Sequence, residues 1–144
     1  DIREVLDDAN INYDDLKDIT LAGAAYQVLE KDPTPDRRIV NGSVAVRREG
    51  VVSPSTLIDP LNIDVNSLVG YENALLSASG VAVINDILSD IVAEIRTGQQ
   101  AQNTTVTFII TGRSEPVGTP TDFKWELKLY FSILGALKID MVEF

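Results

Sequence analysis

Acidic and amide side chains are the groups in this sequence whose spacing could support chemistry. Four of them alternate in the manner of the first ligands of a calcium-binding loop: Asp8, Asn10, Asn12 and Asp14. A complete EF-hand loop also needs glycine at its sixth position and glutamate at its twelfth, and these positions hold Tyr13 and Ile19. The segment is therefore interpreted as a solvated turn that caps a helix, and no metal is expected.

Two further sets of carboxylates could act as acids or bases. Glu126 lies between Lys124 and Lys128 on the polar side of an alternating segment, and this pattern is typical of a surface ladder of charges. A second set recurs at helical spacing: Asp86, Asp90 and Glu94. The favoured interpretation of this set is a solvated helix face, with a contact surface for a basic partner as the alternative. Neither set indicates the pocket pair that acid–base catalysis needs.

The sequence contains no histidine and no cysteine. Catalysis of the Ser-His-Asp or Cys-His type is therefore excluded, and so is a thiolate metal site. No glycine-rich phosphate-binding motif is present either. We therefore expect a protein that is not an enzyme and that holds no cofactor. An enzyme that uses carboxylates alone is kept as a third, disfavoured hypothesis.

The charge balance limits the partners. Twenty-two acidic and 12 basic residues give a formal net charge of −10. Nucleic-acid backbones and anionic membrane surfaces both attract clustered lysine and arginine, so neither is an expected partner. No apolar run approaches the roughly 20 residues that a membrane-spanning helix needs. Other protein subunits are the expected partners, and the compartment is left open, with the virion or the cytoplasm favoured.

The clearest elements are strands near the C-terminus. Residues 123–133 alternate without a fault between apolar and polar side chains, a period of two that only a strand produces. Residues 104–112 alternate in the same way, and residues 137–144 are expected to return from a turn at Gly135 as the second strand of a hairpin. These three segments predict three consecutive antiparallel strands.

The rest of the chain predicts two helical regions and one more strand. Apolar residues recur at helical spacing from residue 14 to 28 and again from residue 64 to 95, with Gly98 as a C-terminal cap. The second region carries a continuous apolar stripe that is expected to cover residues 123–133. Residues 39–48 are predicted as a strand, and residues 49–60 as an irregular excursion.

These elements predict an α+β fold with a single domain over residues 1–144. The expected architecture is a two-layer sandwich, in which a mainly antiparallel four-stranded sheet is packed by the two helical regions. Three of the four strands are the consecutive C-terminal ones.

The leading functional hypothesis is a non-enzymatic structural or assembly protein that acts as a homo-oligomer. A virion component such as a tailed-phage tail or neck ring is the example that its size and acidity favour, by analogy of architecture only. Apolar residues in the excursion and on the outer side of the sheet are predicted to form the subunit contact: Val51, Val52, Leu57, Ile58, Tyr130, Val142 and Phe144.

The alternative hypothesis is a binding domain for a small apolar ligand. A curved sheet crossed by a helix can leave an apolar pocket. The residues expected to line it are Trp125, Phe108, Phe131 and Ile91. A filled core is the favoured interpretation of these four residues.

Overall fold

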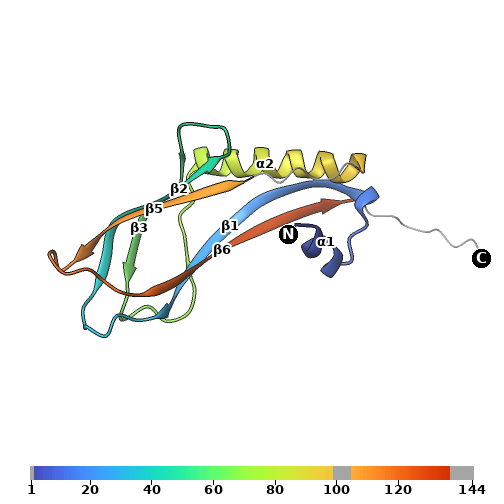
Figure 1. Ribbon diagram of the computed structural model, residues 1–144. Coiled ribbons are helices and arrows are strands. Elements are labelled where there is room, and N and C mark those ends of the chain that lie inside the picture. The colour runs from blue at the N-terminus through green and yellow to red at the C-terminus, as the bar shows by residue number, and fades with distance from the viewer. Residues whose placement is uncertain (1, 99–104, 137–144) are drawn as a thin grey trace, which may run out of the picture.

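The computed structural model describes residues 2–98 and 105–136 of the chain and shows a mostly β protein with two α-helices (Figure 1). Within these residues the elements are α1 (Ile2–Asp8), the 3₁₀ turn η1 (Tyr13–Asp15), β1 (Leu16–Glu30), β2 (Arg38–Arg48), β3 (Ser55–Asp64), β4 (Glu72–Asn73), α2 (Ala78–Thr97), β5 (Val106–Glu115) and β6 (Lys124–Gly135). The strands form two antiparallel three-stranded sheets, in the orders β4–β1–β6 and β3–β2–β5.

The expected single four-stranded sheet is therefore wrong. The consecutive strands β5 and β6 do not pair with each other, because β5 pairs with β2 and β6 pairs with β1. The expected turn at Gly135 is also wrong, since this residue ends β6 and lies opposite Leu16 of β1. The predicted returning strand, residues 137–144, lies outside the described residues.

Strand β1 was predicted as a helix, and its bulges explain the error. The register against β6 shifts between Leu16 and Asp18 and again between Leu21 and Gly23. Each extra residue moves the buried side to the other phase of the alternation. The buried residues consequently recur at a mixture of two- and three-residue steps that resembles a helical period: Leu16, Ile19, Leu21, Ala24 and Tyr26.

Strand β3 occupies most of the segment that was predicted to be irregular. Pro60 lies within it, and a proline is tolerated there because β3 is an edge strand of its sheet. The pairing with β2 places Val44 opposite Ile58 and Ala45 opposite Thr56, which leaves the intervening Leu57 as an extra residue. Leu57 and Ile58 can therefore both be buried although they are neighbours in the chain.

The apolar stripe of α2 is confirmed. Its buried members are Gly80, Ile84, Ile87, Leu88, Val92 and Ile95. The predicted cap is also confirmed, because Gly98 has φ 67° and donates its N–H to the Ile95 carbonyl. The helix predicted to start at Asp64 is absent, since this residue ends β3 and α2 begins at Ala78. The helix packs on β1, β2 and β3 rather than on β6, and Figure 1 shows it lying along β1.

One apolar cluster joins the two sheets and α2. Tyr26 of β1 also connects the sheets, because its hydroxyl donates a hydrogen bond to the Asn62 carbonyl of β3 at 3.1 Å. Burial, with a smaller contribution from Glu72, raises the pKa of Tyr26 to about 12, so its hydroxyl stays protonated. In the part of the chain that the structure describes, no helix has the length and apolar character to cross a membrane.

Gly80 sets the distance between α2 and β3, and its replacement should be costly. A Cβ at this position would overlap the Thr56 carbonyl oxygen and the Leu57 Cα, which are backbone atoms and cannot rotate away. Gly80→Ala should therefore lower the free energy of unfolding by about 2 kcal/mol, although alanine favours helices over glycine. Urea unfolding would measure this. Gly23→Ala is the control, since its nearest contact would be an ordinary 3.7 Å, and an equal loss in both variants would contradict the prediction.

Candidate functional site

Among the described strands, β5 is a sheet edge whose interior-facing side chains are only partly covered. Its residues Ile110 and Phe108 lie opposite Val44 and Val46 of β2, so they share the core-facing side of that sheet. The two valines have no exposed surface. By contrast, Ile110 is 52% exposed and Phe108 is 40% exposed. The core of this sheet therefore ends abruptly at β5.

Strand β6 shows the same feature in the other sheet. Phe131 and Leu129 lie opposite Leu21 and Ala24 of β1, which are buried. Phe131 is nevertheless 40% exposed. We use the term open seam for five of the apolar side chains on the core-facing side of these two edge strands: Phe108, Ile110, Trp125, Leu129 and Phe131. The seam is partly exposed because α2 packs on β1, β2 and β3 rather than beside β5 and β6.

A cavity of about 230 Å³ lies at one end of the open seam. It brings β5 and β6 together, because Ile110 and Gly112 of the first strand and Trp125 of the second line it. Its remaining lining residues are Ile39, Leu61, Ile63, Thr111 and Phe123. Of the four residues predicted to line an apolar pocket, Trp125 lines this cavity, whereas Phe108, Phe131 and Ile91 do not line it.

A second apolar hollow, of about 180 Å³, lies at the other end of β6. Phe131 and Ile133 form one side of it, and Val5 and Leu6 of α1 form the other, with Ile2 and Ile19 completing the lining. Val5 is 51% exposed. The apolar surface along β6 therefore has a hollow at each end, one lined by Trp125 and one by Phe131.

The residues predicted for subunit contact do not form one surface. Val51 and Val52 are exposed in the loop between β2 and β3, at 50% and 88%. Leu57 and Ile58 have no exposed surface, so these two must be removed from the candidate contact. Tyr130 is 47% exposed, but it lies on the side of β6 opposite the seam. Val142 and Phe144 lie outside the described residues.

The acidic side of α2 is partly neutralised by its own chain. Asp90 forms an ion pair with Arg48 of β2 at 2.6 Å. Asp86 lines a hollow of about 240 Å³ together with Arg47, Arg48 and Val51. These contacts tie the helix to the end of β2, and they leave less free negative charge for a basic partner than the sequence suggested.

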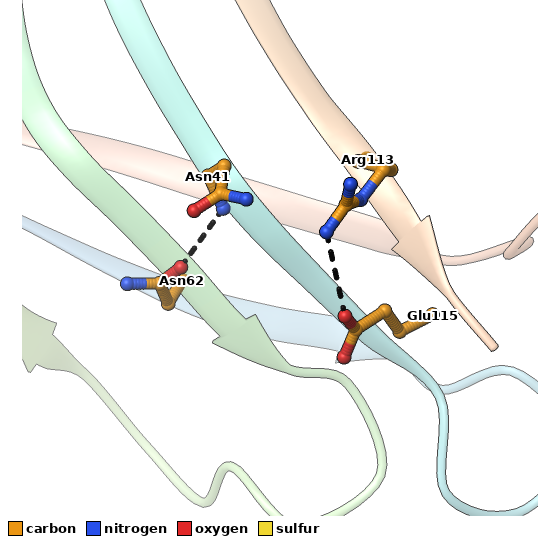
Figure 2. Close-up of polar contacts among 4 residues, drawn as sticks. All are labelled: Asn41, Asn62, Arg113 and Glu115. Atoms are coloured by element: carbon orange, nitrogen blue, oxygen red, sulfur yellow. Dashed lines mark hydrogen bonds and ion pairs between the residues drawn. The ribbon is translucent and has the colours of Figure 1, made fainter. Parts of the chain in front are cut away.

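The outer side of the β3–β2–β5 sheet is mostly polar. Asn62 of β3 accepts a hydrogen bond from the backbone N–H of Asn41 in β2, and Arg113 of β5 points at Glu115 (Figure 2). Ser43 and Thr111 share a further hydrogen bond across this side. Sequence reasoning placed the contact on the outer side of the sheet, whereas the exposed apolar side chains of β5 lie on its inner side.

Glu126 is held as an ionised acceptor. The Tyr71 hydroxyl donates to it at 2.6 Å, and the Gln27 amide donates at 2.7 Å. The Tyr71 hydrogen bond, followed by that of Gln27, lowers the pKa of Glu126. A general acid needs the opposite shift. The Lys128 ammonium lies 4.2 Å from the centre of the Tyr71 ring, so the group is a cross-strand polar cluster.

Asp32 joins three loops at one end of the molecule. Its carboxylate accepts hydrogen bonds from the backbone N–H groups of Thr34 and Asp122, both at 2.7 Å. Asn66 donates to the Asp32 carbonyl at 2.9 Å and accepts from the Arg37 backbone N–H at 2.8 Å. Asp32 and Arg37 are each only 6% exposed. Sequence reasoning missed this cluster because Asp32 and Asp122 are 90 residues apart in the chain.

Acid should loosen this cluster. The hydrogen bond from Asp122, then that from Thr34, lowers the pKa of Asp32 below its ordinary value. A carboxyl group with a lowered pKa stabilises the fold above its unfolded pKa of about 3.9, and this contribution is lost as pH falls through the folded value. We expect Asp32→Asn to reduce the melting temperature at pH 7 and to flatten its fall below about pH 4. Asp36→Asn, an exposed change in the same loop, should do neither.

The structure shows no candidate metal site in the residues that it describes. Within residues 2–98 and 105–136, no group of three or more His, Cys, Asp or Glu side chains could hold a metal ion. No family model, curated protein or solved structure matches this chain.

Proposed function

We propose that the chain is a non-enzymatic assembly protein whose copies associate through the open seam. The observation that supports this proposal is the exposure of Phe108, Ile110 and Phe131 on the core-facing sides of two edge strands. A side chain on that side of a sheet is normally covered by a second layer. Contact with another subunit would supply the missing layer.

The free-energy gain from covering the seam is substantial. Burial of one large apolar side chain contributes about 1.5 to 3 kcal/mol relative to exposure, and the seam offers several that are about half exposed. Among the described strands, β5 and β6 each pair on one side only, so the backbone groups on their other side could add directional hydrogen bonds to an incoming strand. The formal net charge of −10 opposes unspecific association, which favours a defined assembly over aggregation.

Within this class, we propose a ring subunit of a virion, for which the tail and neck rings of tailed phages are the architectural example. Size, acidity and two open strand edges support this narrower proposal. Negative-stain electron microscopy of the purified protein tests it, with closed rings as the expected result. Dimers without further association would contradict the ring while leaving self-association intact.

The native mass tests self-association itself. Size-exclusion chromatography with light scattering should give a multiple of the 15.7 kDa chain mass, and the mass should fall on dilution. High salt should not dissociate the assembly, because an apolar contact is not screened. A mass of one chain at every concentration would refute the proposal.

A second candidate function is the binding of a small apolar ligand in the cavity of about 230 Å³ beside Trp125. An apolar cavity of about 150 Å³ in another protein takes up benzene, so this one could accept a molecule of the size of naphthalene. Trp125 is the only tryptophan in the chain, and its emission would report binding directly. A saturable change on titration with naphthalene would support this function, and a response that never saturates would contradict it.

A further inference from the structure

The charged residues of the two edge strands lie on the outer side of each sheet. Strand β5 carries Arg113 and Glu115, and β6 carries Lys124, Glu126 and Lys128. The charges of β5 cancel, and two lysines against one glutamate leave β6 with +1, although the whole chain has a formal net charge of −10. Two copies that meet through these strands therefore meet at edges that are not acidic, unlike the chain as a whole.

One antiparallel register brings unlike charges together on that outer side. If β5 of one copy lies beside β6 of a second copy with Arg113 opposite Glu126, then Glu115 falls opposite Lys124, because the numbering of antiparallel partners runs in opposite directions. Among the described strands, β5 and β6 are both edges, and every pairing is antiparallel. Opposite charges directly across two strands stabilise their pairing, and like charges destabilise it.

The same register also aligns the open seam of one copy with that of the other. It places Phe108 opposite Phe131 and Ile110 opposite Leu129, and all four side chains lie on the core-facing side of their strands. Phe108 and Phe131 are each 40% exposed in the single chain. Directly opposed aromatic side chains are among the cross-strand pairs that stabilise a sheet. One alignment therefore satisfies both sides of the two strands.

The neighbouring registers fail on one side or the other. A shift of one residue would set the apolar side of one strand beside the polar side of the other. A shift of two residues in one direction would set Arg113 opposite Lys128 and would also set Glu115 opposite Glu126. The same shift in the other direction would set Arg113 opposite Lys124. The charges therefore select the register among alignments that the apolar side chains alone would allow.

The two edges of one copy are held in different sheets. Strand β5 pairs with β2 and strand β6 with β1, and Figure 1 shows them as separate ribbons that a loop connects at one end. This loop is anchored, because Asp122 donates its N–H to the Asp32 carboxylate at 2.7 Å. The Arg37 guanidinium also donates to the Thr119 carbonyl at 3.3 Å. These contacts favour pairing of β5 with β6 between two copies over pairing within one.

We propose that β5 of one copy pairs with β6 of a second copy in the antiparallel register that sets Arg113 opposite Glu126. This inference rests on the proposed self-association and specifies which strands meet and how they are aligned. The single chain already pairs Arg113 with Glu115 at 3.7 Å and Lys124 with Glu30 at 3.3 Å. Both ion pairs are exposed and therefore weak, so these side chains are free to turn towards a second copy.

Cysteine cross-linking tests the register directly, because the native chain contains no cysteine. In the proposed register Ile109 lies opposite Tyr130 on the outer side, and neither residue belongs to the open seam. A mixture of full-length Ile109→Cys and Tyr130→Cys chains should form a disulfide-linked dimer under mild oxidation, whereas neither variant should do so alone. Opposed Cα atoms lie about 4.5 to 5.5 Å apart in an antiparallel pair, which is within the range that a disulfide spans.

A mixture of Thr107→Cys and Tyr130→Cys chains is the matched control. Its two thiols lie on the same outer side but two residues out of register. Cα atoms at such diagonal positions are about 7 to 8 Å apart, which is too far for a disulfide without movement of the backbone. Non-reducing electrophoresis over time should show the linked dimer accumulating faster in the first mixture. Equal rates in the two mixtures would refute the register.

Reversal of one charge pair provides an independent measurement. Glu115→Lys and Lys124→Glu each set like charges opposite each other, so each should weaken association by up to about fivefold, the effect expected of an exposed ion pair. The double variant restores opposite charges and should associate like the native chain. Light scattering over a range of concentrations would measure the three affinities. Two losses that simply multiply in the double variant would contradict the pairing of these residues.

The possible failures are distinguishable. If the native chain assembles and the first mixture gives no linked dimer, the register is refuted while self-association stands. A chain that carries both Ile109→Cys and Tyr130→Cys tests closure within one copy. If it forms an internal disulfide at dilutions where the native chain is monomeric, the two edges pair within one copy, and the inference is again refuted. If the native chain never assembles, the proposed function fails and takes the inference with it.

Discussion

Ile110→Asp should convert the proposed assembly into folded monomers. Ile110 is 52% exposed in the single chain, so its replacement should cost the monomer only about 1 kcal/mol. In the assembly, the same position would be covered, and an unpaired carboxylate would be buried there. The loss of apolar contact together with this desolvation should weaken association at least about 100-fold, which corresponds to roughly 3 kcal/mol. Sedimentation or light scattering over a range of concentrations would measure it.

Thr107→Asp is the matched control for this prediction. It adds the same charge to the same strand, but Thr107 lies opposite Arg47 on the outer side of the sheet. We expect this variant to assemble like the native chain. If both variants assemble normally, the seam is not the contact surface. If both dissociate, the added charge rather than the position is responsible.

The sequence predicted α2 well because one helix face determines it. Ile84, Leu88 and Ile95 recur at helical spacing and are all buried, and Gly98 provides a glycine where the left-handed cap needs one. These signals are local, so they do not depend on what the helix packs against. Which strands the helix covers is a long-range property, and the expectation that it covers residues 123–133 was wrong.

The region from residue 14 to 28 shows where periodicity misleads. A regular strand would have displayed its buried residues at every second position. The two bulges between Leu16 and Gly23 break this period, and alanine-rich sequence near Ala24 further resembles a helix. Because neither β1 nor β3 was predicted as a strand, β6 lost its actual partner and β2 lost one of its two partners. The remaining four strands were therefore assigned to a single sheet.

The candidate site could be predicted only in part. The alternation of residues 123–133 identified the apolar side of β6, including Trp125 and Phe131. It could not show that this side is incompletely covered, because coverage depends on where α2 lies. The loop residues Val51 and Val52, which were predicted for subunit contact, are exposed in the single chain, but the same reasoning included Leu57 and Ile58, which β3 carries into the core.

Leu57→Ala should destabilise the fold rather than weaken a contact between copies. Leu57 has no exposed surface, and it packs among the core residues where α2 meets β3. Truncation of a fully buried leucine removes apolar contacts and leaves a cavity, which together cost about 3 to 4 kcal/mol. This loss is a large part of the stability of a domain of this size, which is about 5 to 15 kcal/mol. The chemical denaturation midpoint should fall accordingly, in the assembly and in a dissociated variant alike.

Val52→Ala is the control that separates the core from the surface. Val52 is 88% exposed in the loop before β3, so its truncation should change the free energy of unfolding by less than about 0.5 kcal/mol. Were Leu57 instead a contact residue, Leu57→Ala would lower the native mass while leaving the melting temperature of the monomer unchanged. If Leu57→Ala lowers the free energy of unfolding equally in the native chain and in the monomeric Ile110→Asp variant, Leu57 belongs to the core. The monomeric variant has no subunit contact that the substitution could remove.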